Sequence, residues 1–265
     1  MCTSGTPRLL HVDMDDIMNR MRNLAIGDIH SSYDRLQNVL AKAGFDKDND
    51  NLYSTGDLCD RGEKPVETLL FLMGLPHFFP VAGNHDLWLY DAIVANNPDD
   101  WWIDHNGGLK TWQKVACNKD RTFVEKVRSW IGDFPFIRIL PDYIIVHGGL
   151  AGITNERELE RYTHLTVSNT YVPQDSFENI VMLRDVELLT WDCDYVYQAL
   201  GAREKWKAPI PPLDTKKTII CGHTPLINTF HSEEYHLTCL DTGSFVEDGH
   251  ISVMDLDTCQ IRQSD

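Results

Sequence analysis

Short apolar segments alternate with helical patterns through the first part of the chain. Three such segments are each followed by a glycine-containing turn and then a helical pattern: Arg22–Ile26, Asn51–Ser54 and Phe78–Val81. Strands that alternate with helices of this length predict βαβ units and a largely parallel sheet. The first helix carries apolar residues at the i, i+3, i+4, i+7 spacing of one helical face, ending at Gly44: Leu36, Val39, Leu40 and Ala43.

Two more helices follow the second and third of these segments. The second shows the same apolar spacing and ends at Gly74, and the third runs to about Ala95. The face predicted to be buried in the second helix consists of Val66, Leu69, Leu70 and Met73. A further amphipathic helix stops at Gly132, with its apolar face at Phe123, Val124, Val127, Trp130 and Ile131.

Residues 97–119 interrupt the alternation with Pro98, a Gly107-Gly108 pair and three tryptophans, Trp101, Trp102 and Trp112. We interpret this segment as a helical cap or long connection. The tryptophans have two interpretations, a packed cap or a surface that stacks on a nucleobase. The packed cap is favoured, because aromatic clusters mostly supply buried area.

The second half of the chain is predicted to contain strands with an irregular insertion between them. The strands are expected at Phe136–Leu140, Tyr143–Val146, Thr218–Cys221, Leu226–Phe230, His236–Leu240 and Ile251–Leu256. Residues 151–217 are charged and less regular, which is typical of a substrate-specific insertion or lid. Residues 1–21 carry no recognisable element and are interpreted as an extension or disordered leader. Residues 22–265 are then expected to form one domain.

Charge and cysteine content restrict the function and the compartment. Lysine and arginine total 24 against 40 aspartates and glutamates, a formal net charge of −16. Such a surface repels polyanions, so binding along a nucleic acid is not expected. No segment reaches the roughly 18 apolar residues of a membrane span. The cysteines are odd in number and scattered, which favours reduced thiols and a cytoplasmic protein: Cys2, Cys59, Cys117, Cys193, Cys221, Cys239 and Cys259.

The chemistry is concentrated where the predicted strands end. The turn Gly56–Gly62 (GDLCDRG) holds Asp57, Asp60 and Arg61 within five residues. Ligand sites of α/β proteins gather at the carboxyl edge of the sheet, where such turns lie. Other strand ends present Asp28 and His30, Asn84 and His85, His147, and His223. Helix capping explains Asp and Asn at turns, but caps do not require histidines, so a functional site is favoured.

These residue types suit a catalytic metal centre. Carboxylate, imidazole and amide oxygen without thiolate favour Mn, Fe, Zn or Co over a structural zinc. The ligands are numerous enough for two divalent cations if one carboxylate bridges them. A bridged pair about 3.5–4 Å apart is the arrangement that drives in-line attack on phosphorus. Histidines outside these turns (His11, His77, His105, His164, His231, His236 and His250) are expected to be surface or core residues.

The ordered motifs GDIH, GDLCDRG, GNHD, HGG and GHT resemble those of the phosphoprotein phosphatase branch of the calcineurin-like metallophosphoesterases. The resemblance covers Asn23 to about Leu256. Within the family, the motifs are most like those of bacterial and phage serine/threonine phosphatases and of the related symmetrical diadenosine tetraphosphate hydrolases. The resemblance implies a β-sandwich flanked by helices, with a dimetal site at the strand ends. The sandwich itself comes from the resemblance; the periodicity indicates only βαβ units.

The resemblance also implies residue roles. The first metal would be bound by Asp28, His30 and Asp57; the second by Asp57, Asn84, His147 and His223. Mn2+ is the expected cation, with Fe, Zn or Co as alternatives, and a hydroxide bridging the metals would attack phosphorus. His85 would protonate the leaving oxygen, oriented by Asp60. Arg61 and Asn84 would contact the substrate phosphate, since Arg binds phosphate oxygens in a bidentate manner.

The sequence departs from the family pattern at three places. Ser31 replaces the glycine that usually follows the first histidine, which predicts a slightly different turn. Asp86 completes GNHD and is not assigned as a ligand. Relatives carry a second phosphate-binding arginine in a Trp-x-Arg stretch, but here the nearest match is Trp191-Asp192-Cys193. Arg184 and Arg203 are the candidates for that role.

Two further residues near the motifs are not assigned as ligands. Cys59 is interpreted as a packing residue, and Asp241 as either a support for the metal ligands or a turn residue.

The leading hypothesis is a serine/threonine protein phosphatase that hydrolyses phosphomonoesters in one step. The alternative enzyme is a symmetrical dinucleoside tetraphosphate pyrophosphohydrolase. A third hypothesis is an inactive metal-binding scaffold, although a scaffold needs neither the acid His85 nor Arg61. The expected partner is a phosphorylated protein or a small phosphoester.

Overall fold

Two β-sheets form the centre of the computed structural model, which describes residues 21–170 and 177–265, without the side chains of 177–183. The first sheet has the strand order β11-β10-β1-β2-β3, with β9 paired to β10, and the second has the order β4-β5-β6-β8-β7. The strands are β1 Asn23–Ile26, β2 Asn51–Ser54, β3 Phe78–Pro80, β4 Ile137–Ile139, β5 Tyr143–Val146, β6 Thr218–Cys221, β7 Phe230–Ser232, β8 Leu237–Cys239, β9 Asp241–Thr242, β10 His250–Asp255 and β11 Ile261–Gln263.

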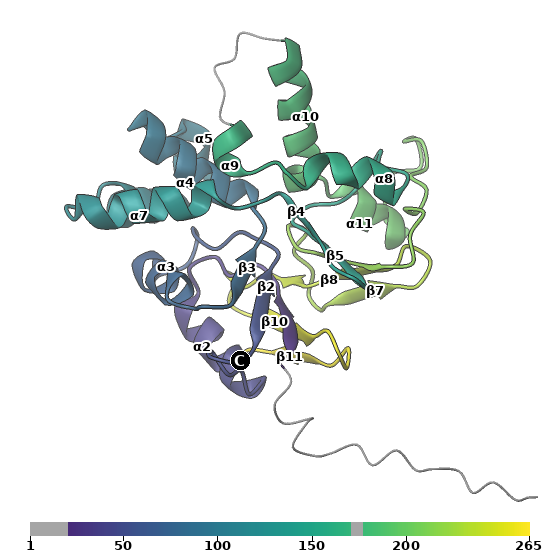
Figure 1. Ribbon diagram of the computed structural model, residues 1–265, viewed down its shortest axis with the longest axis horizontal. Helices are drawn as coiled ribbons and strands as arrows, with labels where there is room; N and C mark the ends of the chain where they lie inside the picture. Colours follow the sequence, from purple (N-terminus) through teal and green to yellow (C-terminus); the bar gives the residue numbers. More distant parts are fainter. Residues whose placement is uncertain (1–20, 171–176) are drawn as a thin grey trace, which may run out of the picture.

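Helices lie on the outer sides of the two sheets (Figure 1). They are α2 Tyr33–Lys42, α3 Pro65–Met73, α4 Asn84–Ala95, α5 Asp100–His105, α6 Leu109–Thr111, α7 Arg121–Gly132, α8 Glu156–Leu159, α9 Val167–Thr170, α10 Phe177–Trp191 and α11 Asp194–Ala199. A π-helical turn spans Trp112–Ala116 and a 3-10 turn spans Glu160–Tyr162. None of the helices in the described ranges combines the length and hydropathy that spanning a bilayer requires.

The predicted parallel βαβ units are present. Strands β1, β2 and β3 pair in parallel, while β10 is antiparallel to β1. In the second sheet β5, β6 and β8 are parallel, and β4 and β7 are antiparallel strands at its edges. The carboxyl ends of both sets of parallel strands carry the turns that the sequence singled out.

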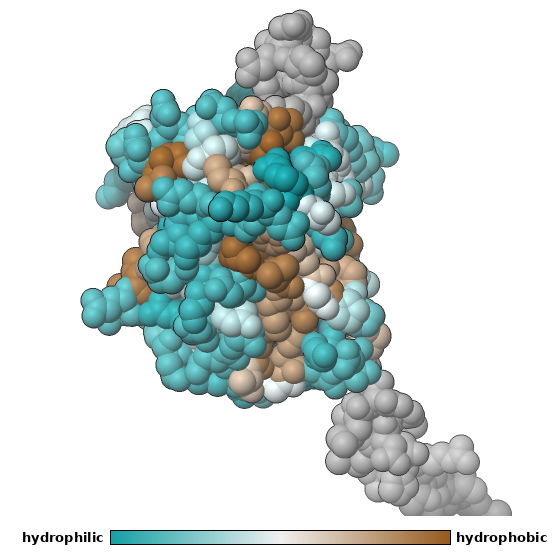
Figure 2. Space-filling view, turned by 90° about the vertical axis from the view of Figure 1, so that its left-hand side faces the viewer, coloured by the Kyte–Doolittle hydropathy of each residue, from teal (hydrophilic) through white to brown (hydrophobic). Residues whose placement is uncertain are grey.

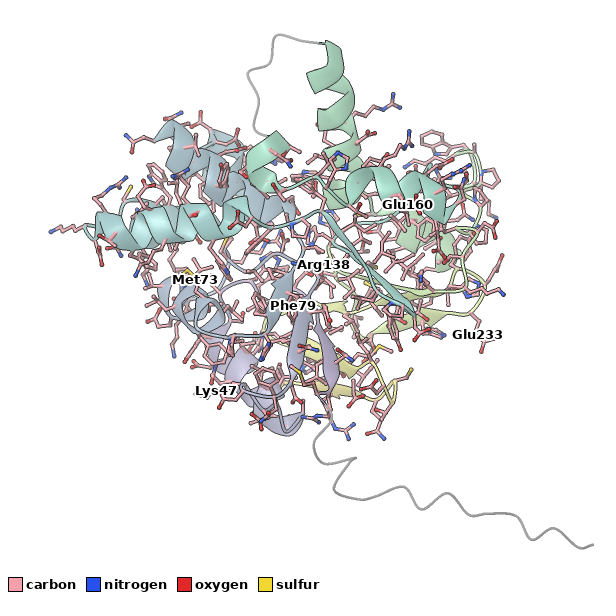
Figure 3. All side chains as sticks on the ribbon, in the orientation of Figure 1. Lys47, Met73, Phe79, Arg138, Glu160 and Glu233 are labelled. Atoms are coloured by element: carbon pink, nitrogen blue, oxygen red, sulfur yellow. The ribbon has the colours of Figure 1, made fainter. Side chains whose placement is uncertain are left out.

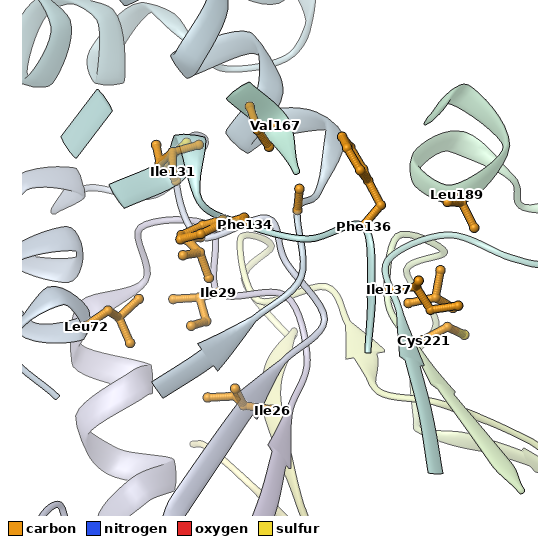
Figure 4. Packing of buried hydrophobic residues seen from close by; sticks show 14 of the residues in the cluster. Ile26, Ile29, Leu72, Ile131, Phe134, Phe136, Ile137, Val167, Leu189 and Cys221 are labelled. Carbon is orange, nitrogen blue, oxygen red and sulfur yellow. The ribbon is translucent and has the colours of Figure 1, made fainter. Parts of the chain in front are cut away.

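The central strands bury side chains on both faces, because each strand alternates its residues between two layers. On β5, Ile144 and Val146 pack with the larger cluster that includes the helices, whereas Ile145 joins a smaller separate cluster. The same alternation places Ile220 of β6 in the smaller cluster. Figure 4 shows part of the larger cluster, where Ile26 of β1 and Ile137 of β4 are both buried.

Arg138 joins the edge strands of the two sheets. Its Nε donates to the carbonyl of Pro80 at 2.9 Å, and its guanidinium carbon lies 5.7 Å from the ring centroid of Phe79. Figure 3 shows Arg138 and Phe79 as neighbours on β4 and β3. The face in Figure 2 is mostly hydrophilic with apolar patches near its middle, as expected of a chain with net charge −16.

Some sequence predictions were wrong in detail. The strand predicted at Leu226–Phe230 is absent from the described chain at that position: Ile227 is 87% exposed, and pairing begins at Phe230. In α3, Leu70 is 52% exposed and the buried face includes Leu69 and Leu72. Residues 69–73 are all apolar, so periodicity cannot select the face there.

The two segments expected to be caps contain helices joined by irregular chain, which includes residues 200–217. Residues 97–119 contain α5, α6 and the π-helical turn, and residues 151–217 contain α8 to α11, including the long helix α10. A role for the second segment in substrate selection stays a prediction. The predicted extension 1–21 lies, apart from Met21, outside the described residues.

Candidate active site

The turn Gly56–Gly62 has an unusual backbone. Asp57, Asp60 and Arg61 have φ values of 52°, 72° and 61°. Non-glycine residues seldom adopt this left-handed region, and those that do cluster at functional sites. Ser31 also has a positive φ, 55°, in the turn where it replaces the usual glycine.

Asp86 holds this turn from the neighbouring helix. Its carboxylate accepts hydrogen bonds from the backbone N–H groups of Asp57 (2.9 Å), Leu58 (3.1 Å) and Gly83 (3.0 Å), and the side chain is fully buried. The motifs do not assign Asp86 as a ligand, and they give it no other role. An acid in the first turn of a helix, after a glycine, was the signal for a capping role.

Asp86→Ala is therefore expected to destabilise the fold by about 3 kcal/mol or more, since each of three buried N–H groups left unpaired costs roughly 1–3 kcal/mol. Urea unfolding in EDTA measures this without a metal contribution. Asp104→Ala, at an exposed position of α5, is the control and should change the free energy of unfolding by less than about 0.5 kcal/mol. An Asp86→Ala protein as stable as the control would contradict this role.

Two groups of potential metal donors share Asp57. His30, Asp57 and His85 form one group, and Asp57, His147 and His223 form the other; within each group the donor atoms lie within 4.8 Å of one another. Oδ2 of Asp57 is 3.5 Å from Nε2 of His30, whereas Oδ1 is 3.3 Å from Nε2 of His147. The two oxygens of one carboxylate thus face different histidines.

Backbone carbonyls fix which histidine nitrogens are free to bind a cation. Nδ1 of His30 donates to the carbonyl of Cys59 at 3.0 Å, and Nδ1 of His147 donates to that of Thr55 at 2.7 Å. A carbonyl only accepts, so each ring carries a proton on Nδ1 and directs Nε2, the nitrogen that can bind a cation, toward Asp57. Nε2 of His147 also lies 3.0 Å from Oδ1 of Asn84. Acceptor atoms that converge in this way are the arrangement a cation stabilises.

The electrostatics of the site agree with cation binding. Burial lowers the pKa of His30 well below its ordinary value, and it lowers that of His223 to about 3, so both rings are neutral. Burial alone would raise the pKa of Asp57, but the nearby imidazoles, His147 foremost, bring it well below its usual range. Burial lowers the pKa of His147, but the charge of Asp57 outweighs that effect and raises it, so His147 and Asp57 stabilise each other's charged forms. A cation would take the place of the His147 proton, because metals bind the neutral imidazole and the ionised carboxylate.

Asp28 is held just beside these groups. Its Oδ1 accepts from the Thr55 hydroxyl at 2.9 Å and its Oδ2 accepts from the backbone N–H of His223 at 3.0 Å. Burial, followed by the charges of Asp241 and Asp57, raises its pKa well above the usual value. A cation would favour the ionised form of Asp28. Asp241 is buried, and its Oδ1 accepts a hydrogen bond from the Gly243 N–H at 2.9 Å, which stabilises the turn after β9. Its charge also acts on Asp28.

His85 and Arg61 complete the cluster. Nδ1 of His85 donates to Oδ2 of Asp60 at 2.6 Å, and its Nε2 is 3.9 Å from Asp57. Arg61 Nη1 lies 3.2 Å from Nε2 of His30, and the guanidinium stacks on Phe245, with its carbon 4.2 Å from the ring centroid. Phe245, which sequence analysis did not single out, comes from the loop after β9. Cys59 is buried, as expected of a packing residue.

The candidates for a second phosphate-binding arginine do not contact this cluster in the described structure. Arg203 donates to the carbonyl of Ala208 and lies 3.4 Å from Asp194. Arg184 is exposed on α10, seven residues before Trp191, or about 10 Å along the helix axis. Trp191 itself borders the site: its ring lies 5.7 Å from that of His223 and 5.0 Å from that of Trp88, which in turn contacts His85.

The comparison that decides the family is a match of residues 21–253 to the calcineurin-like phosphoesterases. The chain belongs to this family. It is therefore a hydrolase that acts on phosphate esters, in a family whose sites hold divalent metal pairs. This family membership confirms the fold class and the resemblance inferred from the motifs.

Relatives and solved structures carry two kinds of name. The chain is 29% identical over 222 residues to serine/threonine-protein phosphatase 2 of Salmonella typhimurium, covering 83% of this chain and 86% of that protein. It is 33% identical over 151 residues to the symmetrical bis(5'-nucleosyl)-tetraphosphatase of Dechloromonas aromatica, covering 56% of this chain and 51% of that protein, about half its length. A serine/threonine phosphatase structure from Saccharomyces cerevisiae matches the fold with a TM-score of 0.57 at 13% identity, covering 95% and 82% of the two chains.

Proposed function

We propose that this phosphoesterase hydrolyses phosphomonoesters, with phosphoserine and phosphothreonine of proteins as the leading substrates and Mn2+ as the cation. The observation that carries the proposal is the shared carboxylate of Asp57, which faces two histidine groups beside the His85–Asp60 pair and Arg61. The near full-length similarity to a serine/threonine phosphatase supports the substrate class.

The donor set fits two divalent cations. The first would be held by Asp28, His30 and Asp57, and the second by Asp57, Asn84, His147 and His223. Carboxylate, imidazole and amide donors suit Mn2+, with Fe, Zn or Co as alternatives. When bound, the cations would activate a water molecule and offset the charge of the phosphate.

The remaining residues bind the phosphate and supply the proton. In one step the water oxygen forms a bond to phosphorus, the ester P–O bond breaks, and its electron pair goes to the leaving oxygen. His85 gives that oxygen the proton on Nε2. The attacking water releases a proton, which passes to Nε2 of His85 and returns the ring to its starting form. Arg61 and Asn84 contact the non-bridging oxygens. Asn84 and His85 lie in the first turn of α4, where the helix N-terminus favours an anion.

A second substrate class, symmetrical dinucleoside tetraphosphates, is favoured by one observation. Trp191 is 42% exposed beside His223, which gives a nucleobase an aromatic surface at the edge of the site. The tetraphosphatase relative points the same way. Of the neighbouring tryptophans in residues 97–119, Trp102 is fully buried and offers a base no surface, whereas Trp101 is 60% exposed.

Removal of metal should abolish the activity. Hydrolysis of p-nitrophenyl phosphate is expected to fall to the rate without enzyme in EDTA and to return when Mn2+ is added in excess. The measurement is release of p-nitrophenol, with a metal-replete sample carried through the same dialysis as the control. No hydrolysis with Mn2+, Fe2+, Zn2+ or Co2+ would leave the inactive scaffold as the better hypothesis.

Substrate class is decided by kcat/KM on two substrates, a phosphoserine peptide and diadenosine tetraphosphate. The protein-phosphatase proposal expects the larger kcat/KM on the peptide. A preference of several orders of magnitude for the dinucleotide would overturn that assignment while leaving the phosphoesterase chemistry intact.

A further inference from the structure

One oxygen of Asp60 receives two hydrogen bonds. Oδ2 accepts from Nδ1 of His85 at 2.6 Å and from the indole Nε1 of Trp102 at 2.5 Å. Asp60, His85 and Trp102 are all buried. The other oxygen, Oδ1, has no hydrogen-bond partner in the described structure. The position of this carboxylate, and with it the orientation of the His85 ring, therefore depends on the indole.

The segment that carries Trp102 also holds the backbone around Asp60. The N–H of Asp60 donates to the hydroxyl of Thr111 at 3.1 Å, and the N–H of Arg61 donates to the carbonyl of Gly107 at 3.2 Å. These bonds hold Asp60 and Arg61, two of the left-handed residues of the turn. Such residues cost conformational energy and persist only when the surroundings fix them.

The Gly107-Gly108 pair makes this approach sterically feasible. A Cβ atom at Gly107 would lie 2.9 Å from Cγ of Arg61, and one at Gly108 would overlap the indole of Trp102. The neighbouring tryptophan has a different environment, since Trp101 is 60% exposed. The tryptophans and glycines of residues 97–119 thus include one buried indole seated against the site.

We propose that Trp102 is a positioning residue for proton donation by His85. This inference rests on the proposed function, in which His85 protonates the leaving oxygen. An indole N–H only donates, so it fixes Oδ2 of Asp60 where that atom also receives Nδ1–H of His85. The imidazole is then held with Nε2 directed into the site. Without the indole, Oδ2 of Asp60 keeps only the bond from His85, and nothing else among the described hydrogen bonds fixes the carboxylate on which the ring is oriented.

The test uses the leaving group. Phenolate is a poor leaving group and needs the proton, whereas p-nitrophenolate leaves without one. For Trp102→Phe with Mn2+, kcat on phenyl phosphate is expected to fall about 10–100-fold, the cost of losing a supporting hydrogen bond, with KM nearly unchanged. On p-nitrophenyl phosphate kcat should change little.

Trp112→Phe is the control. Trp112 is half-buried in the same segment and has no indole hydrogen bond among the described contacts. The rates of this variant on both esters should match those of the wild-type protein.

Two outcomes overturn different claims. An equal loss on both esters in Trp102→Phe would show a general structural defect and overturn the positioning role. No hydrolysis by the wild-type protein would overturn the proposed function itself, and with it the role of His85 as acid.

A second variant and a second readout keep the inference falsifiable if Trp102→Phe is poorly folded. Replacement of Trp102 by benzothienylalanine keeps the ring shape and removes only the N–H donor, so it should reproduce the selective loss on phenyl phosphate. In the metal-free protein, the NMR resonance of the His85 Nδ1 proton should shift in this variant and not in Trp112→Phe. An unshifted resonance would show that the indole does not orient His85.

Discussion

Asp57→Asn is expected to abolish activity and to weaken the binding of both cations by more than about 100-fold. Loss of a residue that only hydrogen-bonds to a metal ligand costs up to about 100-fold in affinity, and loss of the shared ligand itself should cost more. The reason is that each oxygen of Asp57 faces a different histidine group. An amide keeps the shape of the side chain but brings no charge and only one oxygen. Isothermal titration with Mn2+ and the rate on p-nitrophenyl phosphate measure the two effects.

Asp48→Asn is the matched control, because it removes the same charge from an exposed loop position. It should bind Mn2+ and hydrolyse the ester as the wild-type protein does. Should Asp57→Asn keep wild-type affinity at either cation site, Asp57 would not be the shared ligand.

His85→Asn is expected to lower kcat on phenyl phosphate about 10²–10⁴-fold while both cations remain bound. The ring of His85 lies between Asp60 and the donor groups, and its proposed role is to protonate the leaving oxygen. Loss of the acid should matter far less for p-nitrophenyl phosphate. Steady-state rates on the two esters and Mn2+ titration test these expectations.

His164→Asn makes the same change at an exposed position and should leave rates and titration unchanged. A wild-type rate on phenyl phosphate in His85→Asn would remove His85 as the acid. Loss of a cation in that variant would instead identify His85 as a metal ligand. This outcome is included because His85 lies in the donor group with His30 and Asp57.

The βαβ part of the fold was predictable because its signals are local. Strand β2 has the predicted bounds, and helix α2 buries Leu36, Val39 and Leu40 as its spacing predicted. Periodicity fails where every position is apolar, as in α3, and where a strand has only three residues, as in β11. The pairing of two sheets into a sandwich is also non-local, and only the family resemblance supplied it.

The site was predictable to a similar extent. Strand ends bring His30, Asp57 and His147 together, as the motifs predicted, because parallel strands end at one edge. The residues that support them were missed. Asp86 and Trp102 act through hydrogen bonds to residues 28–42 positions away, and a sequence carries no periodic signal for such contacts.

Electron paramagnetic resonance of the protein titrated with Mn2+ tests the central claim most directly. If Asp57 joins two sites, two Mn2+ ions should bind about 3.5–4 Å apart and give the multiline spectrum of an exchange-coupled pair. Asp57→Asn should lose that spectrum, and Asp48→Asn should retain it. A single bound ion, or two ions that show only the six-line spectrum of isolated Mn2+, would contradict a dimetal centre shared through Asp57.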